Sequence, residues 1–575
     1  MAELTRRRFA VSAGAGGLGL LLCTPVASAV DRALRSTAGR AVATAGTTLE
    51  AAAAPVTAGP AYTRLTAGPG WPLAVREDLA PASGGRDDRR TALASFVQFT
   101  DLHFTDAESP ARFEYLHQLV GSAHRPQETL GPVATTALVR RVNSLPGGPF
   151  TGRPFDFMVT TGDNTDNHEH LELDWFLGVL NGGRVRPVSG DPDRHEGVQD
   201  SGSAQYWNPG KRLDDPYTQK GFPQLPELLA MASGEFTSPG LDIPWYCTFG
   251  NHDDSIVGTV PDLPGTDLWY TSRFKVIGKD ESSSRKLAAA INTPGRTVPL
   301  AELFGGTGTI REVTPDQRRK PFSTAEFVQA HLDTANTGPG PEGHGFTGNN
   351  ADGIDVYYTF RIAPGITGIS LDTTTLGGFA DGSIGLGQFS WVEQTLRRSS
   401  SVYYDFFGRK RTQQVTDELF ILFSHHTSGS MGNLLPDIRH LLEPRLDGKT
   451  FTGLLNRFPN VLAWVNGHTH LNKIVPHHGD TPAQGFWEIN TASHIDFPQH
   501  ARVIEVADNA DGTLSLFTTL VEAESPYAAD YADGSPQALA SLYRELSYND
   551  LHVNLGRVGA TADRNTELLI PNPLG

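Results

Sequence analysis

The sequence predicts an α/β fold in which one large domain carries its functional residues at the ends of β-strands. Short apolar runs recur along the chain, and five of them stop directly at Asp, Asn or His. Segments with apolar residues at helical spacing separate these runs, which indicates helical crossovers. In sheets of this kind, ligands gather outside the carboxyl ends of the strands. We therefore expect five distant strand ends to converge on one point.

The first of these strand ends carries Asp101 and His103. The run Phe96–Phe99 is apolar enough for a buried strand, and the two polar residues offer one oxygen and one nitrogen on the same side of the turn that follows. One Asp-x-His is weak evidence for a metal site. The same arrangement returns after four further runs, at Gly162-Asp163, Gly250-Asn251-His252, His425-His426 and Gly467-His468-Thr469-His470.

Bulk composition is that of a globular protein with an acidic surface. The chain has 575 residues, of which 38% are hydrophobic and 19% charged, and its net charge is −17. Length alone suggests about four domains, but the five strand ends must meet in one. The acidic balance argues against a groove for duplex nucleic acid and against an anionic membrane surface, because both partners require a basic face.

The amino terminus has the features of an export signal. Thr5-Arg6-Arg7-Arg8-Phe9 precedes an apolar, Gly-rich stretch, and Ala27-Ser28-Ala29 offers a cleavage site. Residues 1–29 are therefore expected to be a twin-arginine (Tat) signal peptide that engages the Tat export machinery, and the mature protein to be secreted or in the cell envelope. No later segment is apolar and long enough for stable membrane insertion after cleavage. A core helix is the less favoured alternative, because its glycines would weaken it.

The remaining chain is expected to have four parts. These are a flexible Ala/Thr/Gly/Pro linker at 30–90, the main domain at 91–522, loop-rich insertions at about 181–241 and 254–355, and a tail at 523–575. Apolar residues at helical spacing predict helices over 132–145, 170–180, 388–398 and 536–546. Runs at 356–360 and 366–371 predict a hairpin.

The strand ends together offer a mixed set of oxygen and nitrogen ligands. Seven residues are available: Asp101, His103, Asp163, Asn251, one of His425 and His426, His468 and His470. This number exceeds what one tetrahedral zinc needs, and none of them is a thiolate. Carboxylate, amide and imidazole ligands suit two borderline divalent ions, such as Mn, Fe, Zn or Co. Two such ions support in-line phosphoryl displacement.

In these motifs the sequence resembles the calcineurin-like metallophosphoesterases, whose signature blocks occur here in order between about Phe96 and Ile489. The resemblance implies a four-layer α-β-β-α sandwich of two mixed sheets. It also implies that one metal is held by Asp101, His103, Asp163 and His470, and the other by Asp163, Asn251, His425 and His468. His252 would protonate the leaving group after attack by a water held between the metals, and Asp166 would orient His252.

Departures from the family pattern narrow the subgroup. Asp166 stands where purple acid phosphatases have Tyr, and Asn167 where the protein Ser/Thr phosphatases have Arg. Gly-Asp-x-x-Asp-Asn looks more like the bacterial phosphodiesterase branch, in an exported actinobacterial-type subgroup. Thr427-Ser428 replaces two prolines of the family, so the loop after His425 is expected to follow its own path.

These features predict a secreted, dinuclear metal-dependent hydrolase of a small phosphoester, with phosphodiesters slightly preferred over monoesters. A 5'-nucleotidase or nucleotide-sugar hydrolase is a second enzyme hypothesis, disfavoured because about a hundred residues follow His470 and many of them are in core strands. A metal-containing surface binding protein without catalysis is the alternative from another class. Among the other histidines, His494 follows a strand that ends near the site, and we expect it to be structural.

Overall fold

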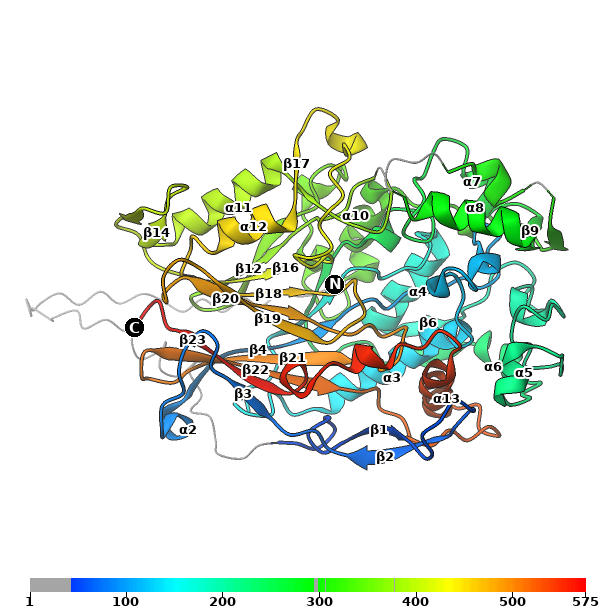
Figure 1. The fold of residues 1–575 in the computed structure, drawn as a ribbon, viewed down its shortest axis with the longest axis horizontal. Coiled ribbons are helices and arrows are strands. Elements are labelled where there is room, and N and C mark those ends of the chain that lie inside the picture. The colour runs from blue at the N-terminus through cyan, green and yellow to red at the C-terminus, as the bar shows by residue number, and fades with distance from the viewer. Residues whose placement is uncertain (1–42, 294–297, 306, 377) are drawn as a thin grey trace, which may run out of the picture. The chain divides into compact units, whose positions relative to one another are not determined.

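The computed structural model describes residues 43–293, 298–305, 307–376 and 378–575, so the predicted signal peptide at 1–29 lies outside the described residues. The described residues form two large mixed sheets with helices on their outer sides (Figure 1). This arrangement confirms the predicted α/β class and its α-β-β-α order of layers.

The seven-stranded sheet has the order β3-β23-β22-β21-β4-β5-β8. Strands β4, β5 and β8 run parallel, and β21, β22 and β23 continue the sheet in antiparallel pairs. Their bounds are β3 Ala74–Arg76, β4 Thr91–Phe99, β5 Phe157–Thr161, β8 Trp245–Thr248, β21 Ala501–Asp508, β22 Thr513–Val521 and β23 Thr566–Pro571. Three of the five predicted strand ends belong to this sheet, at β4, β5 and β8.

The six-stranded sheet has the order β11-β12-β16-β18-β20-β19. Its four central strands are parallel to one another, and each edge strand is antiparallel to its neighbour. Its strands are β11 Tyr358–Ala363, β12 Ile366–Ser370, β16 Leu419–Phe423, β18 Val461–Asn466, β19 Lys473–His478 and β20 Gly485–Asn490. The predicted hairpin is the antiparallel pair β11 and β12. The other two strand ends lie here, at β16 and β18.

The two sheets pack face to face through aromatic and aliphatic side chains. Phe96 of β4 lies 5.7 Å from Phe423 of β16, and Phe157 of β5 lies 5.3 Å from Phe360 of β11, between ring centroids. In β16, Ile421 and Phe423 join the cluster between the sheets, whereas residues 420 and 422 join a cluster with the outer helices. A strand buried on both faces reads as a continuous apolar run, which explains why this pattern is visible in the sequence.

Helices cover the outer face of each sheet. Helices α11 (Leu386–Arg398) and α12 (Gly448–Leu455) pack on the six-stranded sheet, and α3 (Gly131–Ser144), α4 (His170–Asn181) and α13 (Pro536–Asn549) accompany the seven-stranded sheet (Figure 1). The helices predicted at 132–145, 170–180, 388–398 and 536–546 correspond to α3, α4, α11 and α13.

The described residues of the segments expected as insertions form elements of three to eleven residues. In 181–241 these are β6 Gly183–Val185, α5 Pro216–Lys220, α6 Leu228–Ala232 and β7 Phe236–Ser238. In 254–355 they are α7 Asp267–Tyr270, β9 Phe274–Gly278, α8 Glu281–Ile291, α9 Leu300–Leu303, β10 Thr309–Glu312 and α10 Thr324–Leu332. Between β12 and β18 lie β13 Ile384–Gly385, β14 Val402–Tyr404, β15 Lys410–Thr412 and β17 Arg445–Leu446.

The structure differs from the expected linker at 30–90 wherever that segment is described. Strands β1 (Ala51–Pro55) and β2 (Leu65–Pro69) form a hairpin, helix α2 spans Arg86–Arg89, and β3 pairs with β23. The Thr48 hydroxyl donates to the Leu520 carbonyl at 2.9 Å. Small Ala and Thr side chains give little hydrophobic signal, but the backbone pairing of these residues still fixes the segment.

The tail boundary expected at residue 522 also differs, because β23 is an inner strand of the seven-stranded sheet. Its Glu567 is buried and pairs with Arg86 at 2.8 Å and Arg90 at 2.6 Å. A buried acid inside a short strand interrupts the apolar pattern, and its partners lie far away in the sequence. The sequence pattern therefore hid this strand.

Candidate metal centre

The turns that follow the five strands bring the predicted residues together at one edge of the two sheets. Five of these residues have a backbone φ between 47° and 69°, in the left-handed region: Asp101, His103, Asp163, His468 and His470. Such conformations are unfavourable for residues other than glycine and persist only where the surrounding structure imposes them. Their concentration in three turns marks this edge as the functional region.

Two buried carboxylates join the sheets. The Asp163 Oδ2 atom lies 3.1 Å from His425 Nε2, and Asp101 Oδ1 lies 3.2 Å from His470 Nε2. Asp101 also accepts from the backbone N–H of His468 at 3.1 Å. Each contact pairs an acid of the seven-stranded sheet with a residue of the six-stranded sheet.

Three histidines turn one ring nitrogen outward to a fixed acceptor. The Nδ1 atom of His103 lies 2.9 Å from Asp166 Oδ1, that of His470 lies 2.6 Å from Asp496 Oδ2, and that of His425 lies 2.8 Å from the Thr161 carbonyl. A carbonyl can only accept, so the proton is on Nδ1 of His425, and Nε2 presents its lone pair in the neutral ring. The same geometry holds for the other two rings.

The Asn251 side chain also directs its donor away from the site and its acceptor toward it. Its amide Nδ2 donates to the Gly258 carbonyl at 2.8 Å, and its Oδ1 is buried without a hydrogen-bond partner among the described residues. The inward Nε2 of His103 is likewise buried without such a partner. Buried acceptors are normally paired, so these two atoms indicate a ligand that the site is built to hold.

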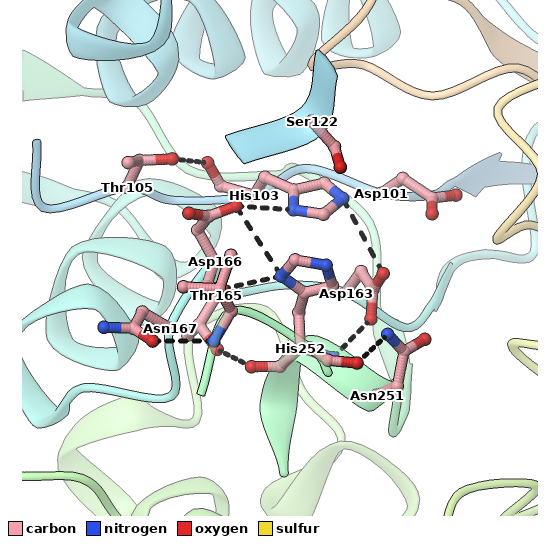
Figure 2. A network of polar contacts seen from close by, with 12 residues as sticks. Asp101, His103, Thr105, Ser122, Asp163, Thr165, Asp166, Asn167, Asn251 and His252 are labelled. Atoms are coloured by element: carbon pink, nitrogen blue, oxygen red, sulfur yellow. Dashed lines mark hydrogen bonds and ion pairs between the residues drawn. The ribbon is translucent and has the colours of Figure 1, made fainter. Parts of the chain in front are cut away.

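His252 lies in the loop that follows β8 and is held by residues of the loop that follows β5. Its backbone N–H donates to Asp163 Oδ1 at 2.8 Å, and its Nδ1 donates to the Asp166 main-chain carbonyl at 2.6 Å. Figure 2 shows the ring beside that of His103, with 4.4 Å between the centroids. Nε2 is therefore the nitrogen available to a substrate.

The role of Asp166 differs from the expectation. Its carboxylate lies 2.9 Å from His103 Nδ1 but 3.6 Å from His252 Nδ1, and only its main-chain carbonyl bonds His252. The reason is Arg112, fully buried, whose guanidinium lies 3.3 Å from Asp166 Oδ2. The side chain of Asp166 thus orients His103, and its backbone orients His252 (Figure 2).

The structure separates His425 from His426. His425 faces Asp163, whereas both ring nitrogens of His426 have other partners, at 2.8 Å to the Thr373 hydroxyl and 2.9 Å to the Ala380 carbonyl. His426 is close enough to His425 and His468 to share a group of possible metal ligands with them. Its occupied nitrogens favour His425, as the sequence comparison with the family predicts.

The buried acids and imidazoles of the site shift each other's pKa values toward the charged forms, against the effect of burial. Burial alone would raise the pKa of Asp101, but the His470 imidazole holds it at about 2. Burial lowers the pKa of His425, whereas the Asp163 carboxylate raises it, and the result is about 9. Burial also lowers the pKa of His252, to about 4, so its ring is neutral in the free site.

Sequence reasoning did not assign roles to Asp496, Arg112 or Arg125. Asp496 holds His470 and is itself paired with Arg125 at 2.7 Å and with Arg557. These arginines help to hold the pKa of Asp496 well below its usual value, although burial opposes them. Asp496 lies close after β20, which is the one signal that could have identified it. Nothing local distinguishes Arg112 or Arg125.

The other histidines have structural surroundings. His494 is buried against Tyr543, with 5.5 Å between ring centroids, and its backbone N–H donates to the carbonyls of Thr100 and Asp101. His494 therefore fixes the turn after β4 through its main chain. His477 pairs with Glu488 at 2.6 Å. His168 and His500 are buried, and none of these four is in a group that could hold a metal among the described residues.

The arrangement fits divalent metal ions by its donor chemistry. The described residues contain overlapping groups of three ligand atoms within 4.8 Å of one another, which include Asp101-His103-His470 and Asp101-Asp163-His425. His103, Asp166 and His252 form another such group, and His425, His426 and His468 a fourth. The inward atoms are carboxylate oxygens, an amide oxygen and imidazole lone pairs, which suit borderline divalent ions.

Comparisons with known proteins find matches among solved structures. No family model matches the chain, and no curated protein matches it. Among solved structures, the chain is similar to a dimetal phosphatase from Danio rerio at 11% identity and a TM-score of 0.29, with 75% of this chain and 99% of that chain covered. At these values the similarity carries no argument, so the chemistry of the site rests on its own side chains.

Proposed function

We propose that this protein is a metal-dependent phosphoester hydrolase that binds two divalent ions, of Mn, Fe, Zn or Co, and slightly prefers phosphodiesters to monoesters. One observation carries the proposal: hydrogen-bond acceptors converge at the site while their donors point outward. Asn251 and His103 each direct the donor to a carbonyl or carboxylate, and their inward acceptors are buried without a hydrogen-bond partner among the described residues. Buried acceptors without partners are unfavourable, and a bound cation would satisfy them.

The ligand sets follow from which atoms share each part of the cavity. Asp101, His103, Asp163 and His470 would hold one ion. His103 Nε2 lies 3.7 Å from Asp163 Oδ2, and His470 Nε2 lies 3.2 Å from Asp101 Oδ1. Asn251, His425 and His468 would hold the other together with Asp163, since His468 Nδ1 lies 3.1 Å from His425 Nε2. When bound, the ions would polarise phosphoryl oxygens and activate a water nucleophile.

His252 is the proposed proton donor to the leaving group. Its Nδ1 proton is fixed on the Asp166 carbonyl, so only Nε2 can meet a substrate. The ring is neutral in the free site, and an anionic phosphoester at Nε2 would favour its protonated form. A protonated Nε2 would then hydrogen-bond a phosphoryl oxygen and deliver its proton to the leaving alkoxide.

Phosphodiester preference and export are the finer parts of this proposal. The preference is supported by the Gly-Asp-x-x-Asp-Asn sequence at Gly162–Asn167. Export by the twin-arginine machinery to the cell envelope or medium is supported by Arg6, Arg7 and the small residues before Val30. Among the described residues, no helix has the length and apolar character required to cross a membrane.

The test is a metal analysis combined with a phosphoester panel. Full-length protein purified with Mn is expected to contain about two ions per chain and to cleave bis-p-nitrophenyl phosphate faster than p-nitrophenyl phosphate. Removal of the metal with a chelator should abolish both activities, and added Mn should restore them. A metal-loaded protein that cleaves neither compound nor any nucleotide would contradict the proposal.

A further inference from the structure

One loop beside the metal centre exposes several aliphatic side chains. The segment 434–442, here called the aliphatic loop, lies between β16 and β17, and its side chains of Leu434, Ile438, Leu441 and Leu442 are 55%, 56%, 64% and 98% exposed. Single exposed aliphatic residues are common on soluble proteins. Four of them within nine consecutive residues form a patch, and such a patch marks an interaction surface.

The aliphatic loop begins at the rim of the site. His426, next to His425, bonds the Ala380 carbonyl, and Asn433 bonds the carbonyls of Gly382 and Gly378 at 2.9 and 3.0 Å. Leu434 follows Asn433 directly. In Figure 1 the yellow segment near the β17 label stands away from α11 and α12, so the loop projects from this rim.

A further exposed leucine lies on a neighbouring loop. A Cβ atom at Gly378 would lie 2.6 Å from the ring of Pro261, and the Gly378 carbonyl accepts from Asn433, so the segment of Gly378 connects the base of the aliphatic loop to the loop of Pro261. Leu263, two residues beyond Pro261, is 52% exposed. The same loop contains Gly258, whose carbonyl orients Asn251. Exposed aliphatic side chains therefore occur on two loops whose bases contact residues of the site.

The ionisable side chains of the aliphatic loop have partners, and Arg439 and Asp437 are also buried. Arg439 contacts Asp437 and Asp372 at 2.8 Å each, and the Arg439 side chain is 7% exposed. His440 pairs with Asp355 at 3.3 Å. No other ionisable residue occurs between 434 and 442, so the projecting face is aliphatic and close to neutral.

We propose that the aliphatic loop docks on a zwitterionic phospholipid surface and that the substrate class of the site is a phospholipid phosphodiester. Protein interfaces draw their binding energy mainly from Trp, Tyr and Arg, and leucine is under-represented there. The exposed side chains of the loop are those of Leu, Ile and Pro436, and aliphatic side chains of this kind suit insertion among acyl chains. The net charge of −17 disfavours an anionic lipid surface. The substrate class rests on the proposed function.

The docking test uses sedimentation of the full chain with phosphatidylcholine vesicles. Wild-type protein is expected to sediment with the vesicles. A double variant, Leu441→Ser with Leu442→Ser, should bind about 100-fold more weakly, since each leucine contributes about tenfold when buried in hydrocarbon. The matched control replaces Val56 and Leu555, which are 61% and 49% exposed elsewhere on the chain, and should bind as the wild type does.

Three docking results would overturn the proposal. The first is wild-type protein that stays in the supernatant. The second is a double variant that binds as the wild type does while its melting temperature is unchanged. The third is a change of oligomeric state by light scattering in the double variant alone, which would assign the loop to contacts between copies of the chain.

The substrate class is tested by the ratio of two activities, on phosphatidylcholine vesicles and on bis-p-nitrophenyl phosphate. The wild type should cleave both, and the ratio should fall at least tenfold in the double variant. Cleavage of the soluble diester without any cleavage of phosphatidylcholine would overturn the substrate class and leave the proposed function standing. Loss of both activities in metal-loaded wild type would instead overturn the proposed function, whatever the vesicles bind.

Discussion

The two sheets contribute unlike residues to one site. The seven-stranded sheet supplies both carboxylates and the amide, whereas the six-stranded sheet supplies only imidazoles, from His425, His468 and His470. Behind the seven-stranded half lies buried charge, in which Arg112 contacts Asp166 and Glu128. The six-stranded half depends on a main-chain carbonyl for His425 and on Asp496 for His470.

This difference shows how the halves depend on each other. Their direct contacts are acid to imidazole, at Asp163 with His425 and at Asp101 with His470. An acid in one half and imidazoles in the other make a complete ligand set only when the sheets are correctly packed. Substitutions in the two halves should therefore separate metal binding, catalysis and stability.

The largest effect is expected at Asp163, the residue that would serve both ions. Asp163→Ala removes the carboxylate shared by the halves, so turnover of bis-p-nitrophenyl phosphate should fall on the order of 1,000-fold, beyond the range of about 10–100-fold typical of outer partners. Metal content should fall at the same time, measured by mass spectrometry of the purified protein. Unchanged metal content would show that the halves do not share this ligand.

His252 should separate catalysis from metal binding within the seven-stranded half. His252→Ala removes the proposed proton donor and leaves every ligand in place, so turnover should fall on the order of 100-fold or more while metal content stays as in the wild type. His170→Ala is the matched control, because this ring is 40% exposed and its one ion-pair contact among the described residues, to Glu326, is long at 3.8 Å. Equal turnover in the two variants would refute the role of His252.

Asp166 and Asp496 offer the sharpest test of the difference between the two halves, since the carboxylate of each fixes one histidine. Asp496→Asn should weaken metal binding about 10–100-fold in a titration, because His470 loses its charged partner. Asp166→Asn should weaken metal binding similarly and also destabilise the fold, because Arg112 is fully buried and loses one of its carboxylate partners. An Asp496→Asn variant that binds metal as tightly as the wild type would contradict the role of Asp496.

The packing between the halves should respond to one added methyl group. A Cβ atom at Gly467 would lie 1.9 Å from Thr100 Oγ1 and 2.5 Å from Asp101 Oδ2, so Gly467→Ala should lower the free energy of unfolding by roughly 1–3 kcal/mol. Gly453→Ala is the control, since nothing lies within 4 Å of its Cβ position in α12. This control should leave stability unchanged or raise it by up to about 1 kcal/mol in denaturant unfolding.

The strand ends could be predicted because each functional residue follows its apolar run almost directly. Asp101, Asp163 and Asn251 stand within three residues of the last strand residue. A buried strand leaves a strong local signal, and the position of its end fixes where the next side chains lie. The meeting of the five strand ends follows from the rule that ligands gather at the carboxyl ends of strands, whereas the two-sheet arrangement was implied by the family resemblance.

What escaped prediction depends on distant partners. The choice of His425 over His426 rested on the resemblance, and its structural reason lies in Thr373 and Ala380, about fifty residues away. Asp166 turns to His103 because Arg112 occupies its other oxygen. The strand β23 was hidden because its Glu567 is satisfied by arginines at the opposite end of the chain. Such pairings have no local sequence pattern.

The most direct measurement is a crystal structure of the Mn-loaded protein with anomalous scattering recorded for the metal. The account predicts two peaks between the sheets, about 3.5–4 Å apart, with Asp163 contacting both and with His425 and His470 on different ions. A single peak bound by residues of only one sheet, or peaks that leave Asp101 and His470 without a metal, would contradict the claim that the two halves form one metal centre.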